Sequence, residues 1–159
     1  MNKMSIKDFT KSIQMLKTER QLVLQGIENL SDEQILKIPD GRRNNILWNL
    51  GHIVVTQQFL HYTLSRLDMR IPKEMASMFR TGTSPAVWKE TPDIKNLKLF
   101  LNELPDKLLE DYESGLFKEF RPYKTSLGVR LNYFEDAIAF NHFHEGLHTG
   151  IILGLIRLV

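Results

Sequence analysis

Apolar residues recur at alternating steps of three and four along four long segments of this chain, and this helical period constrains the fold more than any other feature. No segment shows the sustained alternation of a strand. In the first segment the recurring positions hold Phe9, Ile13, Leu16, Arg20, Val23, Ile27 and Leu30. Ser5 followed by Asp8 indicates where this helix begins. We therefore expect an all-α protein, an antiparallel four-helix bundle formed by one domain over residues 1–159.

The second segment, residues 45–66, carries two neighbouring stripes and so predicts a broad buried face. One stripe consists of Trp48, His52, Val55, Phe59 and Tyr62, and the other of Ile46, Leu50, Ile53, Leu60, Leu64 and Leu67. Between residues 68 and 91 the pattern stops, and Pro72, Gly82 and Pro85 indicate a long connection with one short helix near 73–78. Such a connection permits a crossover between the second and third helices.

The third helix is expected to begin at Thr91 and Pro92, with a kink at Pro105. The fourth is expected to begin at Asn132, which forms a capping-box pattern with Glu135. Its predicted core stripe is Phe134, Ala137, Asn141, His144, His148, Ile151, Leu155 and Leu158. Because the other faces of this segment are also apolar, it should be buried on more than one side, and we expect a homodimer.

Composition narrows the functional classes. The chain has no cysteine, which excludes thiolate nucleophiles and disulfides and fits a reducing compartment. Its net charge of +2 is spread evenly, with Arg42 and Arg43 as a local basic pair, so no nucleic-acid partner is expected. The longest apolar run, residues 150–155, is too short to cross a membrane, and the first residues lack the apolar core of a signal peptide. We expect a cytoplasmic protein.

Residues 144–148 read HEGLH, which has the form of the helical zinc motif H-E-x-x-H. In zinc proteases of this class a third ligand follows downstream, but residues 149–159 contain no His, Asp, Glu or Cys. The metalloprotease interpretation is therefore disfavoured. A di-iron bundle would need a second Glu-x-x-His and two further glutamates, and the histidines of the second segment are preceded at that spacing by Asn49 and Gln58.

Helical phase indicates which histidine can join His144 and His148 at a metal ion. Residues four apart lie on one helix face, and His52 occupies the equivalent stripe of the second segment. At about 100° per residue, His142 points away from His144, and His61 lies opposite His52. Three neutral imidazoles would leave a divalent ion an open position, as in catalytic sites. The alternative is a set of core histidines hydrogen-bonded to backbone or side chains.

Two charged residues are candidates for a catalytic role. Glu145 occupies the general-base position of H-E-x-x-H, although an exposed carboxylate at the rim is the more frequent arrangement. Arg20 could bind an anionic substrate near the metal, or it could send its guanidinium to a carboxylate or to solvent. Asn49, Thr56 and Asn141 each lie one turn from a proposed ligand and are candidates to orient it.

Three stretches of the chain resemble the DinB/YfiT-like superfamily of metal-binding four-helix bundles: WNLGHIVVTQ at 48–57, FRTGTSP at 79–85, and residues 132–157 with FNHFHEGLH inside them. The resemblance implies that His52, His144 and His148 bind a divalent ion such as zinc, nickel or iron. It also implies an up-down-down-up bundle and frequent homodimers. Characterised relatives are transferases or isomerases that use thiols such as bacillithiol or mycothiol.

The sequence leaves more than one function open. The first is a metal-dependent transferase that delivers a low-molecular-weight thiol to a small electrophilic substrate, in detoxification or a stress response. The second is a non-catalytic metal-containing module that binds a ligand or a partner. A third is a metal-dependent hydrolase with Glu145 as its general base.

Overall fold

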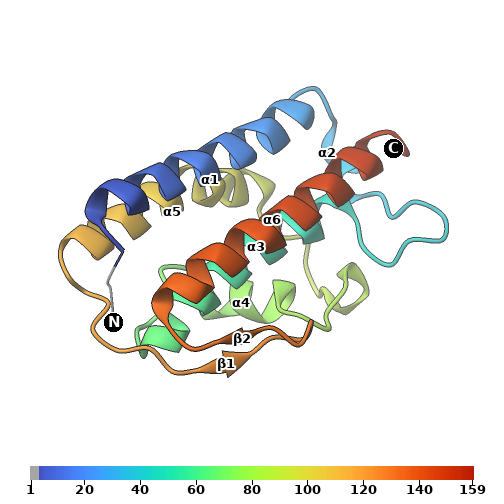
Figure 1. Ribbon diagram of the computed structural model, residues 1–159. Helices are drawn as coiled ribbons and strands as arrows, with labels where there is room; N and C mark the ends of the chain where they lie inside the picture. The colour runs from blue at the N-terminus through green and yellow to red at the C-terminus, as the bar shows by residue number, and fades with distance from the viewer. Residues whose placement is uncertain (1–3) are drawn as a thin grey trace.

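The computed structural model describes residues 4–159, apart from the side chain of residue 87, and the chain is mostly helical (Figure 1). The helices are α1 Ile6–Gly26, α2 Asp32–Leu36, α3 Ile46–His61, α4 Lys73–Phe79, α5 Ile94–Glu113 and α6 Phe134–Ile156, with short 3₁₀ turns η1 Thr63–Ser65 and η2 Pro85–Val87. Strands β1 Tyr123–Lys124 and β2 Arg130–Leu131 form a small antiparallel hairpin. The expected all-α character is confirmed, with this hairpin as an addition.

The four long helices pack against one another in a ring. Helix α1 contacts α5 and α6, and α3 contacts the same two helices. In Figure 1, α6 lies in front of α3, while α4 and the hairpin lie below this pair. The long connection between α3 and α5 therefore carries α4 along the side of α3. None of the helices described combines the length and apolar character needed to cross a membrane.

The start and the stripe of α1 agree with the sequence. The Ser5 hydroxyl accepts a hydrogen bond from the backbone N–H of Asp8 at 3.1 Å and caps the helix. The predicted stripe is buried from Phe9 to Ile27, and this includes Arg20. An arginine at such a position must find partners inside the bundle.

The end of α3 and the start of α5 were predicted wrongly. Helix α3 ends at His61 rather than near residue 66, where Arg66 adopts a left-handed conformation with φ of 60°. Helix α5 begins at Ile94 instead of Pro92, because the carboxylate of Asp93 accepts the N–H of Asn96 at 3.0 Å. A short acidic side chain directly before the first apolar position caps the helix better than a threonine farther away.

The start of α6 also differs from the expected Asn132–Glu135 capping box. The helix begins at Phe134, and the carboxylate of Asp136 accepts the N–H groups of Asn132 and Tyr133 at 2.7 and 3.1 Å. Glu135 instead accepts a hydrogen bond from the backbone of Met4. Asp136 thus takes the capping role that was expected of Glu135.

The core stripe of α6 was placed about one residue away from its true position. Ile151 and Leu158, predicted as core, are 48% and 46% exposed. Four positions of the predicted stripe are buried as expected: Phe134, Ala137, Asn141 and Leu155. Between them the buried line runs through Glu145, Thr149 and Ile152 rather than through the histidines and Ile151. His144 and His148 flank this line and are half-buried. Because α6 is apolar nearly all round, its sequence alone did not select the buried face.

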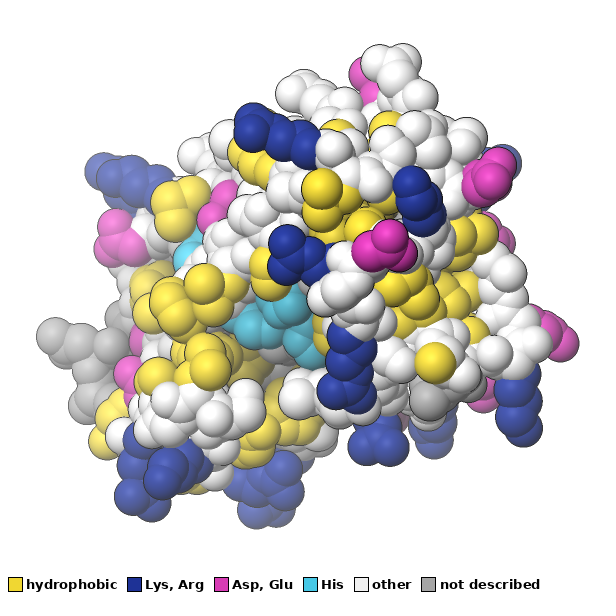
Figure 2. All heavy atoms as spheres, turned by 90° about the vertical axis from the view of Figure 1, so that its right-hand side faces the viewer, with side chains coloured by type: hydrophobic (Ala, Val, Ile, Leu, Met, Phe, Trp, Pro, Cys, Tyr) yellow, Lys and Arg dark blue, Asp and Glu magenta, His cyan; other side chains and the backbone are white. Residues whose placement is uncertain are grey.

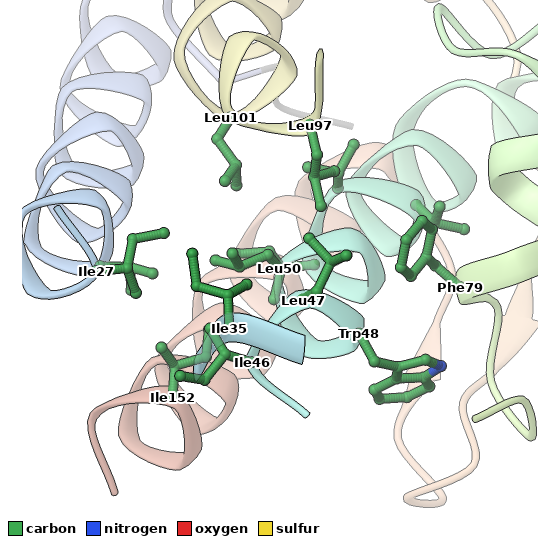
Figure 3. Close-up of a cluster of buried hydrophobic side chains, with 14 of the residues drawn as sticks. Ile27, Ile35, Ile46, Leu47, Trp48, Leu50, Phe79, Leu97, Leu101 and Ile152 are labelled. Carbon is green, nitrogen blue, oxygen red and sulfur yellow. The ribbon is translucent and has the colours of Figure 1, made fainter. Parts of the chain in front are cut away.

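The main hydrophobic core joins one end of the ring to the crossover. Figure 3 shows Leu50 of α3 among side chains of several elements, with Phe79 of α4 packed beside them. Gly51 allows this approach, since a Cβ atom there would overlap the ring of Phe79. The close contact of α4 with α3 places the last turn of α4 beside His52.

Candidate metal centre

Three histidines from two facing helices meet at one point. His52 comes from α3, and His144 and His148 come from successive turns of α6. One ring nitrogen of each lies within 4.8 Å of the others. The Nε2 atoms of His52 and His144 are 3.2 Å apart. The structure brings together the three side chains that helical phase selected.

The other two histidines lie elsewhere, as the phase argument predicted. His61 is buried on the opposite side of α3, where its Nδ1 bonds to the carbonyl of Gln57 at 2.8 Å. His142 faces α1, where its ring contacts the Ser12 hydroxyl at 2.6 Å and the Glu19 carboxylate at 3.4 Å. Both therefore have partners of their own.

The donor set fits a divalent ion. Nδ1 of His52 donates to the carbonyl oxygen of Phe79 at 2.7 Å, and Nδ1 of His148 donates to Oδ1 of Asn49 at 2.8 Å. These bonds leave the Nε2 lone pairs of both rings free, which is the usual arrangement of metal-binding histidines. A tetrahedral ion with metal–nitrogen distances of about 2.0–2.1 Å holds its ligand nitrogens about 3.3–3.4 Å apart. The separation between His52 and His144 is close to that value.

His144 differs from its two neighbours. Its Nδ1 is buried and has no hydrogen-bond partner among the residues described. Burial and the two nearby imidazoles lower the pKa of His144 to about 3. Burial also lowers the pKa of His148 to about 4 and that of His52 below its usual value. Three neutral rings with converging nitrogens form a site that favours a cation other than the proton.

The crossover segment supports the site from one side. The indole of Trp48 stacks on the ring of His52 with centroids 4.6 Å apart and an interplanar angle of 11°. Nε1 of Trp48 donates to the hydroxyl of Thr83 at 3.0 Å. Together with the bond from His52 to Phe79, these contacts connect α3 to both sides of Arg80.

Glu145 is fully buried, so the expected exposed carboxylate was wrong. Its two oxygens accept hydrogen bonds from Nη2 and Nε of Arg20 at 2.8 and 3.0 Å. The amide of Asn141 donates to the same carboxylate at 3.0 Å, and Arg20 also donates to Gln57. The guanidinium of Arg20 therefore pairs with a carboxylate of the protein, as in the second alternative that the sequence left open. The geometry gives Glu145 no freedom to act as a general base.

One of the three orienting candidates contacts a histidine in the expected way. Asn49 bonds to His148, whereas Asn141 serves Glu145, and Thr56 lines a neighbouring cavity. A single cation on an apolar stripe, such as Arg20, predicts a buried acidic partner. The sequence has several acidic residues on other helices, so it did not identify Glu145 as that partner.

A cavity of about 400 Å³ adjoins His144, and no sequence pattern had indicated it. Its walls come from α3, α4, α6 and the loop between β1 and β2, including Thr56, Ser77, Leu127 and Phe140. The volume falls within the range of about 300–1,000 Å³ that is typical of small-molecule sites. Figure 2 shows histidine side chains at the surface in a hollow that is bordered by Lys or Arg side chains.

A family model described as the DinB superfamily matches residues 15–152, a range that contains the three histidines, Arg20 and Glu145. No protein of curated function gives a significant match.

Proposed function

The chain belongs to the DinB superfamily, and we propose that it is a metal-dependent transferase acting with a low-molecular-weight thiol on a small electrophilic substrate. The observation that carries this proposal is the pairing of an open three-histidine donor set with a cavity that reaches His144. A metal site that only stabilises the fold usually has four protein ligands, whereas a catalytic site keeps one position open. Detoxification and stress responses are settings in which such a transfer is useful.

His52, His144 and His148 would hold the ion, and imidazole ligands suit zinc, nickel or iron. When bound, a divalent ion on three neutral imidazoles keeps its full charge and lowers the pKa of a thiol or water at its open position. The residues of the chain supply the remaining parts. Phe79 and Asn49 fix the tautomers of two ligands, and the cavity beside the third holds the electrophile away from bulk water.

The Arg20–Glu145 pair has a supporting role in this proposal. It ties α1 to α6 at the turn that carries the histidines, and it sets the rotation of α6 about its axis. A hydrolase with Glu145 as general base is not supported, because both carboxylate oxygens are already engaged. The transferase and the non-catalytic module remain the functions to distinguish.

We further propose the up-down-down-up bundle typical of the family. In Figure 1 the colours show that α1 and α6 run from left to right along their axes, whereas α3 and α5 run from right to left. The packing of α1 with α5 and of α3 with α6 then joins antiparallel helices. This arrangement requires the long crossover between α3 and α5.

A homodimer is also part of the proposal. Exposed apolar side chains lie on neighbouring helices, with Met15 and Leu22 on α1 and Phe143, Leu147 and Ile151 on α6. Burying this face against a second copy would remove apolar area from water. A specific interface of this kind buries about 1,200 Å² or more in total.

Thiol conjugation tests the proposal. Metal-loaded protein is incubated with 1-chloro-2,4-dinitrobenzene and each of glutathione, bacillithiol and mycothiol, and the thioether that forms as sulfur displaces chloride is measured. We expect metal-dependent conjugation with at least one thiol, lost in His52→Ala and retained in His142→Gln, whose ring lies on the other side of α6. Equal rates with and without the protein for all three thiols would favour the non-catalytic module.

A further inference from the structure

The cavity beside His144 has an apolar interior and a polar rim. Its apolar lining includes Val55, Phe59 and Leu60 from α3 and Phe140 from α6. The side chains on α4 and in the loops add hydroxyl groups but no carboxylate, since no Asp or Glu lines the cavity. A ligand that fits these walls has an apolar body and few polar groups.

Arg80 is the one charged residue among those that line the cavity. It follows the last residue of α4 and is exposed. Within residues 4–159 its guanidinium has neither an ion pair nor a side-chain hydrogen bond. A second cation lies close by, since Nη2 of Arg43 donates to the carbonyl oxygen of Gly82 in the same loop at 3.0 Å. The one charge in the cavity lining is therefore positive, and it favours an anion over a cation.

Chain connectivity places the backbone of Arg80 at the histidine end of the cavity. The residue before Arg80 is Phe79, whose carbonyl oxygen bonds to His52. On α6 the cavity extends from His144 back by one turn to Phe140. A ligand whose anionic group meets Arg80 would thus have its polar end near the histidines and its apolar body toward Phe140 and Phe59.

We propose that the cavity binds small apolar carboxylates through an ion pair with Arg80. A planar guanidinium without a protein partner pairs well with a carboxylate, because two parallel N–H···O bonds can form. That this ligand is the electrophilic substrate rests on the proposed transferase function, whereas the binding itself does not. The assignment gives the substrate a class: an acid with a compact aromatic or aliphatic body.

Three probes of one shape and different charge test this assignment: 4-phenylbutanoate, 4-phenylbutanamide and 4-phenylbutylamine, titrated calorimetrically into metal-loaded protein. The carboxylate should bind about tenfold more tightly than the amide, and the amine should bind most weakly. Arg80→Gln should lower carboxylate affinity to that of the amide and leave amide binding unchanged. Arg42→Gln removes the same charge from an exposed residue outside the cavity and should have a much smaller effect.

Two further measurements separate the alternatives. Ser77→Trp, at an exposed position of the cavity wall, should weaken the carboxylate and the amide alike. Equal binding of the carboxylate and the amine would overturn the proposal, as would equal losses in Arg80→Gln and Arg42→Gln. Carboxylate binding that survives Arg80→Gln but disappears in His52→Ala would place the anion on the metal instead. Failure of every thiol in the conjugation assay, with this binding intact, would count against the transferase alone.

Discussion

The buried pair of Arg20 and Glu145 makes Glu145→Gln the most informative stability variant. Arg20 is 1% exposed, and the substitution removes the charge that compensates its guanidinium. The amide that replaces the carboxylate keeps one acceptor oxygen but carries no charge. The other acceptors of Arg20, Gln57 at 3.2 Å and the carbonyl of Leu101 at 3.4 Å, are also neutral, and both bonds are longer than those to Glu145. Breaking a buried ion pair by removing one partner costs about 3–5 kcal/mol, so the free energy of unfolding should fall by that amount.

Urea denaturation of the metal-free protein, followed by circular dichroism, measures this change. A loss of this size is a large part of the roughly 5–15 kcal/mol that stabilises a domain. As a control, Glu110→Gln removes an exposed carboxylate that pairs with Lys107. This substitution should lower the free energy of unfolding by less than about 1 kcal/mol. The double variant Arg20→Met with Glu145→Leu leaves no buried charge from this pair and should be more stable than Glu145→Gln.

Metal content provides a second measurement on the same variant. Neither oxygen of Glu145 bonds to a histidine, so folded Glu145→Gln should still bind metal under conditions in which it remains native. A loss in unfolding free energy below about 1 kcal/mol would refute the ion-pair argument. So would a double variant less stable than the single one.

Four other predictions follow from the same contacts. His52→Ala leaves two ligands on one helix and should reduce metal content by mass spectrometry steeply, while His142→Gln should retain it; full occupancy in His52→Ala would mean that the wrong histidine was chosen. Burial lowers the pKa of His61 to about 4, so its neutral ring contributes about 3 kcal/mol of stability that is complete above about pH 6.5 and is lost as the pH falls toward 4. In urea titrations of metal-free protein, His61→Gln should remove about that much of the pH dependence and leave the part that comes from His52, His144 and His148. Gly51→Ala forces apart the packed α3 and α4 and should lower the melting temperature and the metal affinity together, at a cost of about 1–3 kcal/mol; an unchanged melting temperature would contradict the overlap. Phe143→Glu, on the exposed face of α6, should shift sedimentation toward monomer without loss of stability, and a wild type that is monomeric at micromolar concentration would remove the dimer proposal.

The histidine cluster was predictable because helical period carries direction as well as secondary structure. Spacing of four placed His144 and His148 on one face, and the stripe of α3 separated His52 from His61. These inferences needed only the axis and phase of each helix. They did not depend on the helix ends, which were displaced by several residues in α3 and by one or two in α5 and α6.

Burial of Glu145 and the cavity were not predictable in the same way. Helix α6 is apolar on most faces, so its stripe could be drawn through His144 or through Glu145 with similar support. The partner that decides between them, Arg20, lies 125 residues away on another helix. The cavity depends on how the crossover and the hairpin loop fold over α3 and α6, and neither segment has a periodic pattern. Tertiary packing, not local sequence, determined both features.

The connection between α3 and α5 is anchored on both sides of Arg80, and this limits how its length can vary. The Phe79 carbonyl binds His52, and the Thr83 hydroxyl binds Trp48, which stacks on the same imidazole. Loops between helices usually accept inserted residues at little cost. One residue added between positions 79 and 83 would displace one of these anchors and turn the imidazole, whereas one added in the exposed turn at Asp40 and Gly41 would leave both in place. Length changes among related chains should therefore fall outside residues 79–83.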